Sequence, residues 1–469
     1  MTGSPELVDA RAPRVGGGVR EPRWGRVVVI GVGCCVVLIA AAMLVPYLTG
    51  WQTHAQSFPP LHARLQARVG PGTPAALLLG VLAVVFAPRA TTWRWGRLLI
   101  AVFAFGVAWM VSLAAVDGVA GLGSVLESHG EYLQTARRVD DAFALLHGYI
   151  ARIPLHSPGH WPTHLAGHPP GAVLFFVLLV RVGLGSALAA GLAVIVIAAT
   201  TAVAVLVTLR RLGAEGVARR AAPFLAAGPA AIWMGVSADA VFAATAAWAA
   251  CALAVAVTSP TRARMLWWGA LAGVLFGWCV MFSYGLPLLG VLALAMLWRG
   301  RSWLPLVTVV VGGATVVLAF AAAGFAWWDA LPVLQRRYWD GIASSRPGAY
   351  WTWADLAALS VSAGPWVGAG VAAASVETFG RRARAARAVG GAGSRARATA
   401  AILTLAVLTI ILLADLSQMS RAEVERIWLP FVPWLLASIG LLPAHWRRVG
   451  IIVQVVFALA VQHLIWSQW

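Results

Sequence analysis

DGVAGLGSVLESHGEYLQTARRVDDAFALLHGYIARIPLHSPGHWPTHLAGHPPG, residues 117–171, is a polar stretch between two apolar runs, and it cannot cross a membrane. A loop of this length in a hydrophobic protein is usually functional or disordered. Tyr132, Tyr149, Trp161 and recurring prolines argue against disorder. Six of the chain's ten histidines lie here: His129, His147, His156, His160, His164 and His168. We therefore interpret residues 117–170 as a long structured loop that carries a catalytic or binding site.

The composition places the rest of the chain in a membrane. Hydrophobic residues make up 60% of the sequence, charged residues only 11%, and the mean hydropathy is +0.81. The formal net charge of +18 comes entirely from arginines, which cluster in short groups between apolar runs. Such clusters indicate membrane topology, so we expect no nucleic-acid partner. All four cysteines lie inside apolar runs, which predicts neither disulfides nor a cysteine metal site.

The apolar runs predict an all-α bundle of about thirteen transmembrane helices. The segment 171–185 is too short to cross and contains Arg181, so we expect a re-entrant or interfacial helix there. The predicted parts are a disordered cytoplasmic tail at 1–26, a three-span segment at 27–116, the loop at 117–170, core spans at 171–324, a second extracytoplasmic loop at 325–353, and C-terminal spans at 354–469 with a flexible cytoplasmic linker at 380–398.

The distribution of charge predicts the orientation. With the arginine clusters in the cytoplasm, the N-terminus is cytoplasmic, whereas the 117–170 loop and the C-terminus lie outside the plasma membrane. The absence of lysine beside abundant alanine, glycine and arginine suggests a bacterial source. Most of the acids then fall outside. They either solvate ordinary loops or line a site that handles protons, cations or hydroxyls.

The loop histidines have a regular spacing. His156, His160, His164 and His168 recur at every fourth residue, which on a continuous helix would align four metal ligands. Prolines at positions 158 and 162 break such a helix, so we favour solvated or hydrogen-bonded histidines over zinc ligands. These residues identify no cofactor with certainty, and a divalent ion held by acids is a further option.

Two acids and three arginines are candidates for the chemistry of the outer face. Asp117 and Asp239 each lie where an apolar run ends, so each is either a helix cap or part of a pair with a general base and a second carboxylate. Arg426, Arg336 and Arg337 are placed to bind a lipid phosphate, or else are surface residues.

Several short motifs occur in an order that resembles the GT-C superfamily of integral-membrane glycosyltransferases, which includes the aminoarabinose transferases and protein mannosyltransferases. The resemblance covers residues 117–442. Here the first acid follows two extra spans, and no large domain follows the last span. The motifs are His168-Pro169-Pro170-Gly171, Leu209-Arg210-Arg211-Leu212-Gly213, Asp239, Phe282-Ser283-Tyr284-Gly285-Leu286 and the run from Arg426 to Pro433, RIWLPFVP.

This resemblance implies a glycosyltransferase that moves a sugar from a polyprenyl-phosphate donor to a glycan, lipid or protein acceptor of the cell envelope. Asp117 would be the catalytic base, with Glu131 and Asp141 as alternatives. Asp239 and His168 would support it. Arg426 would face the donor phosphate, with the Arg336-Arg337 pair as the alternative.

Two other functions fit the same sequence. A membrane transporter or flippase of envelope precursors would use the outer acids and histidines as a proton or substrate path. We find no convincing internal repeat, and the ionisable groups cluster at the outer interface, which favours the transferase. An inactive scaffold in envelope assembly would have the same pattern.

The predicted topology can be tested by cysteine labelling in a cysteine-free background. We expect a membrane-impermeant reagent added outside to label His147→Cys but not Ala392→Cys, because the first lies in the outer loop and the second in the cytoplasmic linker. Labelling of Ala392→Cys with none at His147→Cys would reverse the orientation.

Overall fold

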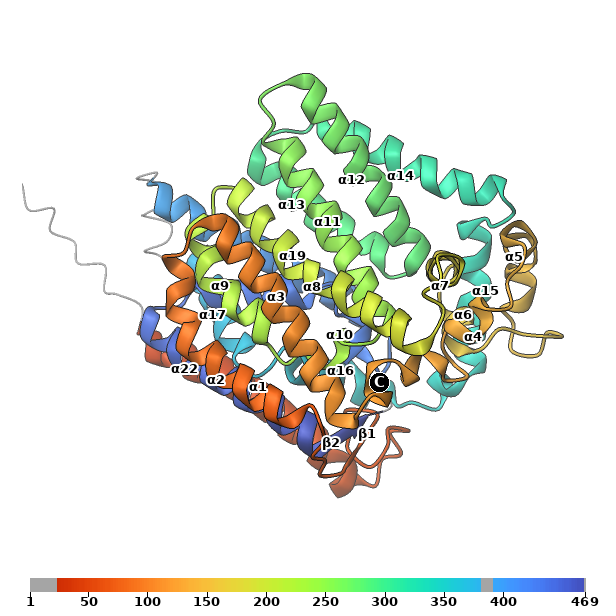
Figure 1. Cartoon of the computed structure of the whole chain (residues 1–469), viewed down its shortest axis with the longest axis horizontal. Helices are drawn as coiled ribbons and strands as arrows, with labels where there is room; N and C mark the ends of the chain where they lie inside the picture. The colour runs from red at the N-terminus through yellow and green to blue at the C-terminus, as the bar shows by residue number, and fades with distance from the viewer. Residues whose placement is uncertain (1–22, 381–390, 468–469) are drawn as a thin grey trace, which may run out of the picture.

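The computed structural model describes residues 23–380 and 391–467, and the regular secondary structure of this part is almost entirely helical (Figure 1). The predicted disordered tail at 1–26 lies outside the described residues except for 23–26, and α1 begins at Trp24. Residues 381–390 of the predicted linker also lie outside them. Its described remainder is mostly helical, because α19 begins at Ala392.

Nine helices of the described part are long and apolar enough to cross a membrane. They are α1 (Trp24–Thr49), α2 (Thr73–Phe86) with η1 (Ala87–Thr91), α3 (Trp95–Ala114) with η2 (Ala115–Asp117), α8 (Ala187–Arg211), α11 (Ala238–Val257), α12 (Arg262–Phe282), α14 (Pro305–Ala322), α19 (Ala392–Leu416) and α22 (Ala444–Leu464). A tenth candidate span is the pair α16 (Gly348–Ser362) and α17 (Val367–Phe379), which is bent by 105°. The chain is therefore a polytopic helical membrane protein.

The predicted number of thirteen spans is too high. Three of the predicted crossings coincide with helices that are short or broken: α9 (Glu215–Ala227) with α10 (Ala231–Met234), η6 (Leu286–Leu288) with α13 (Leu289–Gly300), and α20 (Val424–Ile427), α21 (Val432–Ala437) and η8 (Ser438–Leu441). Val432–Leu441, for example, is buried throughout. This segment is apolar because other helices surround it, and hydropathy alone does not distinguish this environment from lipid. The segment after residue 170, α7 (Gly171–Arg181), is too short to span, as predicted.

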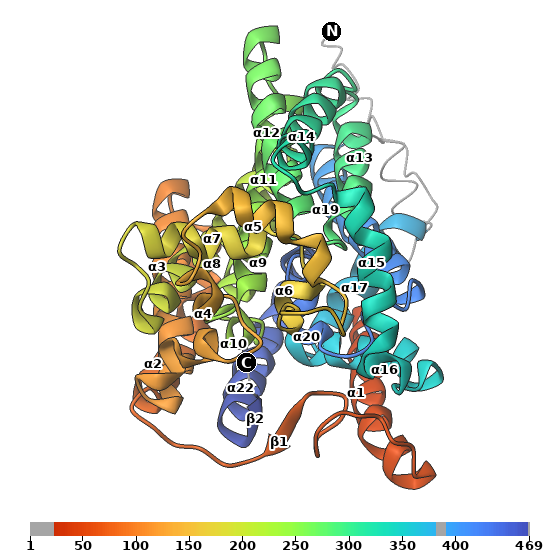
Figure 2. The same cartoon turned by 90° about the vertical axis from the view of Figure 1, so that its right-hand side faces the viewer.

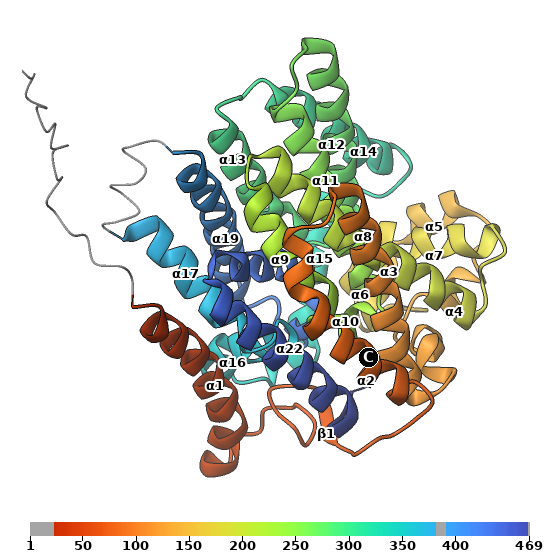
Figure 3. The ribbon, with the colours of Figure 1, turned by 60° about the vertical axis from the view of Figure 1, so that its left-hand side comes forward.

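Polar contacts define two ends of the bundle. At one end Arg219 donates to the Trp93 carbonyl at 2.6 Å, and Arg397 donates to the Leu441 carbonyl at 2.9 Å. At the other end β1 (Ala63–Leu65) pairs with β2 (Ile465–Ser467), beside the end of α22 (Figure 3). Because α2 and α3 connect the two ends, the arginine-bearing turns and the 117–170 segment lie on opposite sides. Which side faces the cytoplasm stays a prediction.

Residues 117–170 fold into short helices joined by turns rather than into one open loop. These are η2, η3 (Ala120–Leu122), η4 (Ser124–Glu127), α4 (Leu133–Ala136), α5 (Ala142–Gly148), η5 (Ile150–Arg152) and α6 (Thr163–Gly167). Buried aromatic residues hold them: the Tyr149 hydroxyl donates to the Leu165 carbonyl at 2.8 Å, and the Trp161 indole donates to the Tyr149 carbonyl at 2.9 Å. In Figure 2 these helices face the viewer beside α15 (Trp327–Asp340), which belongs to the predicted second loop.

The sharp bend between α16 and α17 is stabilised by a glutamine from α22. The Gln454 side-chain amide donates to the Ala363 carbonyl at 2.7 Å, and its oxygen accepts from the Trp366 backbone N–H at 3.4 Å. Gln454 is fully buried. Backbone groups freed at a break inside a membrane protein need such partners, because no water is available to them.

We expect Gln454→Leu to destabilise the protein by about 1–3 kcal/mol, because it leaves buried backbone groups at the bend without partners. Thermal unfolding of purified protein in detergent measures this loss. Gln335→Leu is a matched control on the exposed face of α15 and should unfold like wild type. Equal unfolding temperatures for both variants would contradict this role of Gln454.

Candidate functional site

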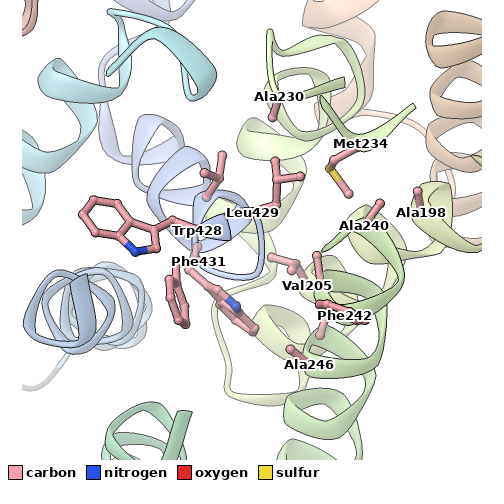
Figure 4. Close-up of a cluster of buried hydrophobic side chains, with 14 of the residues drawn as sticks. Ala198, Val205, Ala230, Met234, Ala240, Phe242, Ala246, Trp428, Leu429 and Phe431 are labelled. Atoms are coloured by element: carbon pink, nitrogen blue, oxygen red, sulfur yellow. The ribbon is translucent and has the colours of Figure 1, made fainter. Parts of the chain in front are cut away.

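The site is built around α20, the short helix that carries Arg426. Directly after it, Trp428, Leu429 and Phe431 are buried in the hydrophobic core, in the same cluster as Phe242 of α11 (Figure 4). This apolar anchor fixes the position of a helix that is too short to be stable alone. The adjoining arginine is thereby held inside the protein.

Arg426 is 4% exposed and binds two side chains from distant parts of the chain and one from its own segment. Its guanidinium donates to Asp239 at 2.7 Å, to His164 Nε2 at 2.9 Å and to Glu423 at 3.0 Å. Although burial alone lowers the pKa of Arg426, the neighbouring Asp239, Glu423 and Glu131 carboxylates raise it above its ordinary value. The arginine is therefore charged at every physiological pH.

The contact with Arg426 decides which ring nitrogen of His164 accepts a hydrogen bond. An arginine can only donate, so His164 Nε2 accepts and its proton lies on Nδ1. Nδ1 lies 2.7 Å from a Glu131 carboxylate oxygen and donates to it. Burial raises the pKa of Glu131, but His164 and Arg426 outweigh burial and hold this pKa below its ordinary value. A chain of charge-assisted hydrogen bonds thus links Glu131, His164 and Arg426.

Glu423 extends this chain to a second arginine. Its other carboxylate oxygen accepts from Arg346 at 3.4 Å, and Arg346 also donates to His62 Nε2 at 2.8 Å. Burial raises the pKa of Glu423, but the two arginines outweigh this effect and hold the pKa at about 2. We call the connected side chains the Arg426 cluster, which comprises His62, Glu131, His164, His168, Asp239, Arg346, Glu423 and Arg426.

His168 is the member of the cluster with a basic lone pair available. Its Nδ1 lies 2.9 Å from the His164 carbonyl and must donate to it, so the lone pair is on Nε2. Burial lowers the pKa of His168, which keeps the ring neutral at neutral pH, while the Asp239 carboxylate acts in the opposite direction. His168 is also partly exposed, unlike Glu131, Asp239 and Arg426.

Three further buried acids lie behind the cluster. They are Glu425, which is 1% exposed, Asp355 of α16 and Asp415 of α19. Asp355 lies near enough to Glu425 and to Asp415 for electrostatic repulsion between their carboxylates. Burial raises the pKa of Glu425 to about 8, and the nearby Glu423 charge adds to this effect. Glu425 is thus a neutral carboxylic acid at pH 7.

The structure brings some of the predicted site residues together and separates others. Glu131, His168, Asp239 and Arg426 belong to the cluster. The other predicted site residues lie outside the cluster. Asp117 pairs with Arg68, and Asp141 accepts hydrogen bonds from two N–H groups at the start of α5. Arg337 donates to the carbonyls of Ile153 and Trp161, whereas Arg336 is exposed on α15. Asp117 and Asp141, two of the three acids predicted as base, therefore have structural partners outside the cluster.

Four other members of the cluster, His62, His164, Arg346 and Glu423, and the adjoining Glu425 had no predicted role in the site. For His164, the regular histidine spacing was a signal, but it suggested a metal or solvent rather than an arginine partner. Glu423 and Glu425 stand next to Arg426 between apolar runs, and a charged run in that position could have indicated them. For His62 and Arg346, which lie 284 residues apart, the sequence contains no signal of contact.

Comparison with known proteins does not assign the chain to a family, because no protein-family model and no curated protein matches its sequence. Within residues 23–380 and 391–467, no three histidine, cysteine, aspartate or glutamate side chains converge in a way that could hold a metal ion.

The raised pKa of Glu425 predicts how stability depends on pH. The folded protein keeps this proton up to about pH 8, whereas the unfolded chain loses it near the ordinary value of 4.5, so stability should fall as pH rises between these values. Thermal unfolding at several pH values should show a smaller fall in Glu425→Gln than in wild type. The exposed Glu127→Gln is the control and should keep the wild-type slope. An unchanged slope in Glu425→Gln would contradict the assignment.

Proposed function

We propose that this protein is a membrane glycosyltransferase that moves a sugar from a polyprenyl-phosphate donor to an acceptor of the cell envelope. The supporting observation is the composition of the Arg426 cluster. Three of its members stand in motifs that resemble GT-C enzymes: His168 begins the His-Pro-Pro-Gly motif, Asp239 follows the short turn, and Arg426 begins the late Arg-Ile-Trp-Leu-Pro motif.

In this proposal His168 accepts the proton of the acceptor hydroxyl on Nε2. The acceptor oxygen forms a bond to the anomeric carbon of the sugar, and the bond from that carbon to the donor phosphate breaks. The lipid phosphate leaves with the electron pair. Asp239 stabilises the imidazolium that forms, because its charge raises the pKa of His168. His164 keeps the His168 region in place through its contact with Arg426, and Glu131 in turn holds His164.

The charge of Arg426 is already compensated by Asp239 and Glu423, so we assign it to holding the acids in position rather than to the phosphate. Arg337 is engaged with loop carbonyls. Arg336 is exposed on the same helix, and we assign the donor phosphate to it.

The proposal is tested in a deletion strain complemented with wild type or with variants. Deletion should cause one polyprenyl-phosphate sugar to accumulate and the matching envelope linkage to disappear, both measured by mass spectrometry. His168→Gln should lower the transfer rate by roughly a hundredfold, as expected for the loss of a general base. The exposed His160→Gln in the same segment is the matched control, and Asp117→Asn should also retain activity.

Two results would overturn the proposal. One is a deletion strain that accumulates no lipid-linked sugar. The other is transfer by purified protein from a nucleotide sugar with no lipid donor present. Full activity of His168→Gln together with loss in Asp117→Asn would move the base to Asp117.

A further inference from the structure

An apolar groove of about 190 Å³ lies between α2, η1, α3 and α9, at the end of the bundle that carries the arginine turns. Phe86, Trp93, Leu98, Phe105 and Pro223 are among the residues that line it. Its walls are hydrophobic and it opens on the outside of the bundle, so within a membrane it admits a hydrocarbon chain. None of its lining residues belongs to the Arg426 cluster.

Two arginines stand over aromatic residues that line this groove. The Arg89 guanidinium carbon lies 4.9 Å from the centre of the Phe86 ring, and that of Arg97 lies 5.1 Å from the centre of the Trp93 ring. Both arginines are exposed. Positive charge is thus concentrated beside an apolar groove, which is complementary to an anionic head group attached to an apolar chain.

A third arginine fixes the wall of the groove. Arg219 donates to the Trp93 carbonyl at 2.6 Å, and it also forms an ion pair with Glu215 at 2.6 Å. Because Arg219 has these partners, it positions the turn that carries Trp93 and leaves the recognition of a head group to Arg89 and Arg97.

We propose that this groove binds an anionic phospholipid of the surrounding membrane, with an acyl chain between α2, α3 and α9 and the phosphate at Arg89 and Arg97. The lipid would occupy the gap between short α9 and the first spans. This proposal is independent of the glycosyltransferase assignment, because it concerns the opposite end of the bundle.

Native mass spectrometry of the full-length protein tests this proposal with phosphatidylglycerol and phosphatidylcholine of identical acyl chains. Wild type should bind phosphatidylglycerol preferentially. The double variant Arg89→Gln/Arg97→Gln should weaken that binding by roughly 25-fold, since each of the two arginines near a membrane surface contributes about fivefold. Its binding of phosphatidylcholine should change much less, because the choline cation offsets the charge of the phosphate.

Two further variants separate charge from shape. Arg262→Gln/Arg264→Gln removes two exposed arginines elsewhere and should keep the wild-type preference. Ala101→Phe fills the groove and should reduce binding of both lipids. Equal affinity of wild type for the two lipids, or an unchanged preference in Arg89→Gln/Arg97→Gln, would overturn the proposal. So would binding of polyprenyl phosphate at this groove without binding of phosphatidylglycerol.

Discussion

The buried charge of Arg426 is the constraint on which the rest of the site depends. A guanidinium inside a protein needs carboxylate partners, and breaking a buried ion pair typically costs about 3–5 kcal/mol. Here the partners are Asp239 at the start of α11 and Glu423 beside α20, and His164 links the same arginine to Glu131. Segments far apart in the sequence are therefore held at one place by the need to compensate one charge.

The apolar core makes that compensation effective. Trp428, Leu429 and Phe431 hold α20 among the surrounding helices, so Arg426 is kept from water and its contacts act in a low dielectric. The same burial has a different effect on Glu425, because desolvation there outweighs the attraction of Arg426 and Arg346 and raises the pKa to about 8, so Glu425 stays protonated at neutral pH. Two acids separated by a single residue, Glu423 and Glu425, thus carry different charges because of their partners.

Part of the cluster was predictable from the sequence. Glu131, His168, Asp239 and Arg426 were expected at the site from their polar segments and from the resemblance to GT-C enzymes, and all four lie in one cluster. Asp117 has the same local pattern as Asp239, yet it pairs with Arg68. A lone acid at the end of a helix can bind any cation that the fold brings near it, so local pattern does not identify its partner.

The sequence by itself determined that this is a helical protein of the membrane, because its apolar runs are long and its arginines lie between them. Only the tertiary structure decided how many of those runs are long helices, since segments such as Val432–Leu441 are apolar through burial by protein rather than by lipid. It also decided which acids face which arginines. Hydropathy depends on each residue's own chemistry, whereas a buried ion pair depends on two residues that the fold brings within hydrogen-bonding distance.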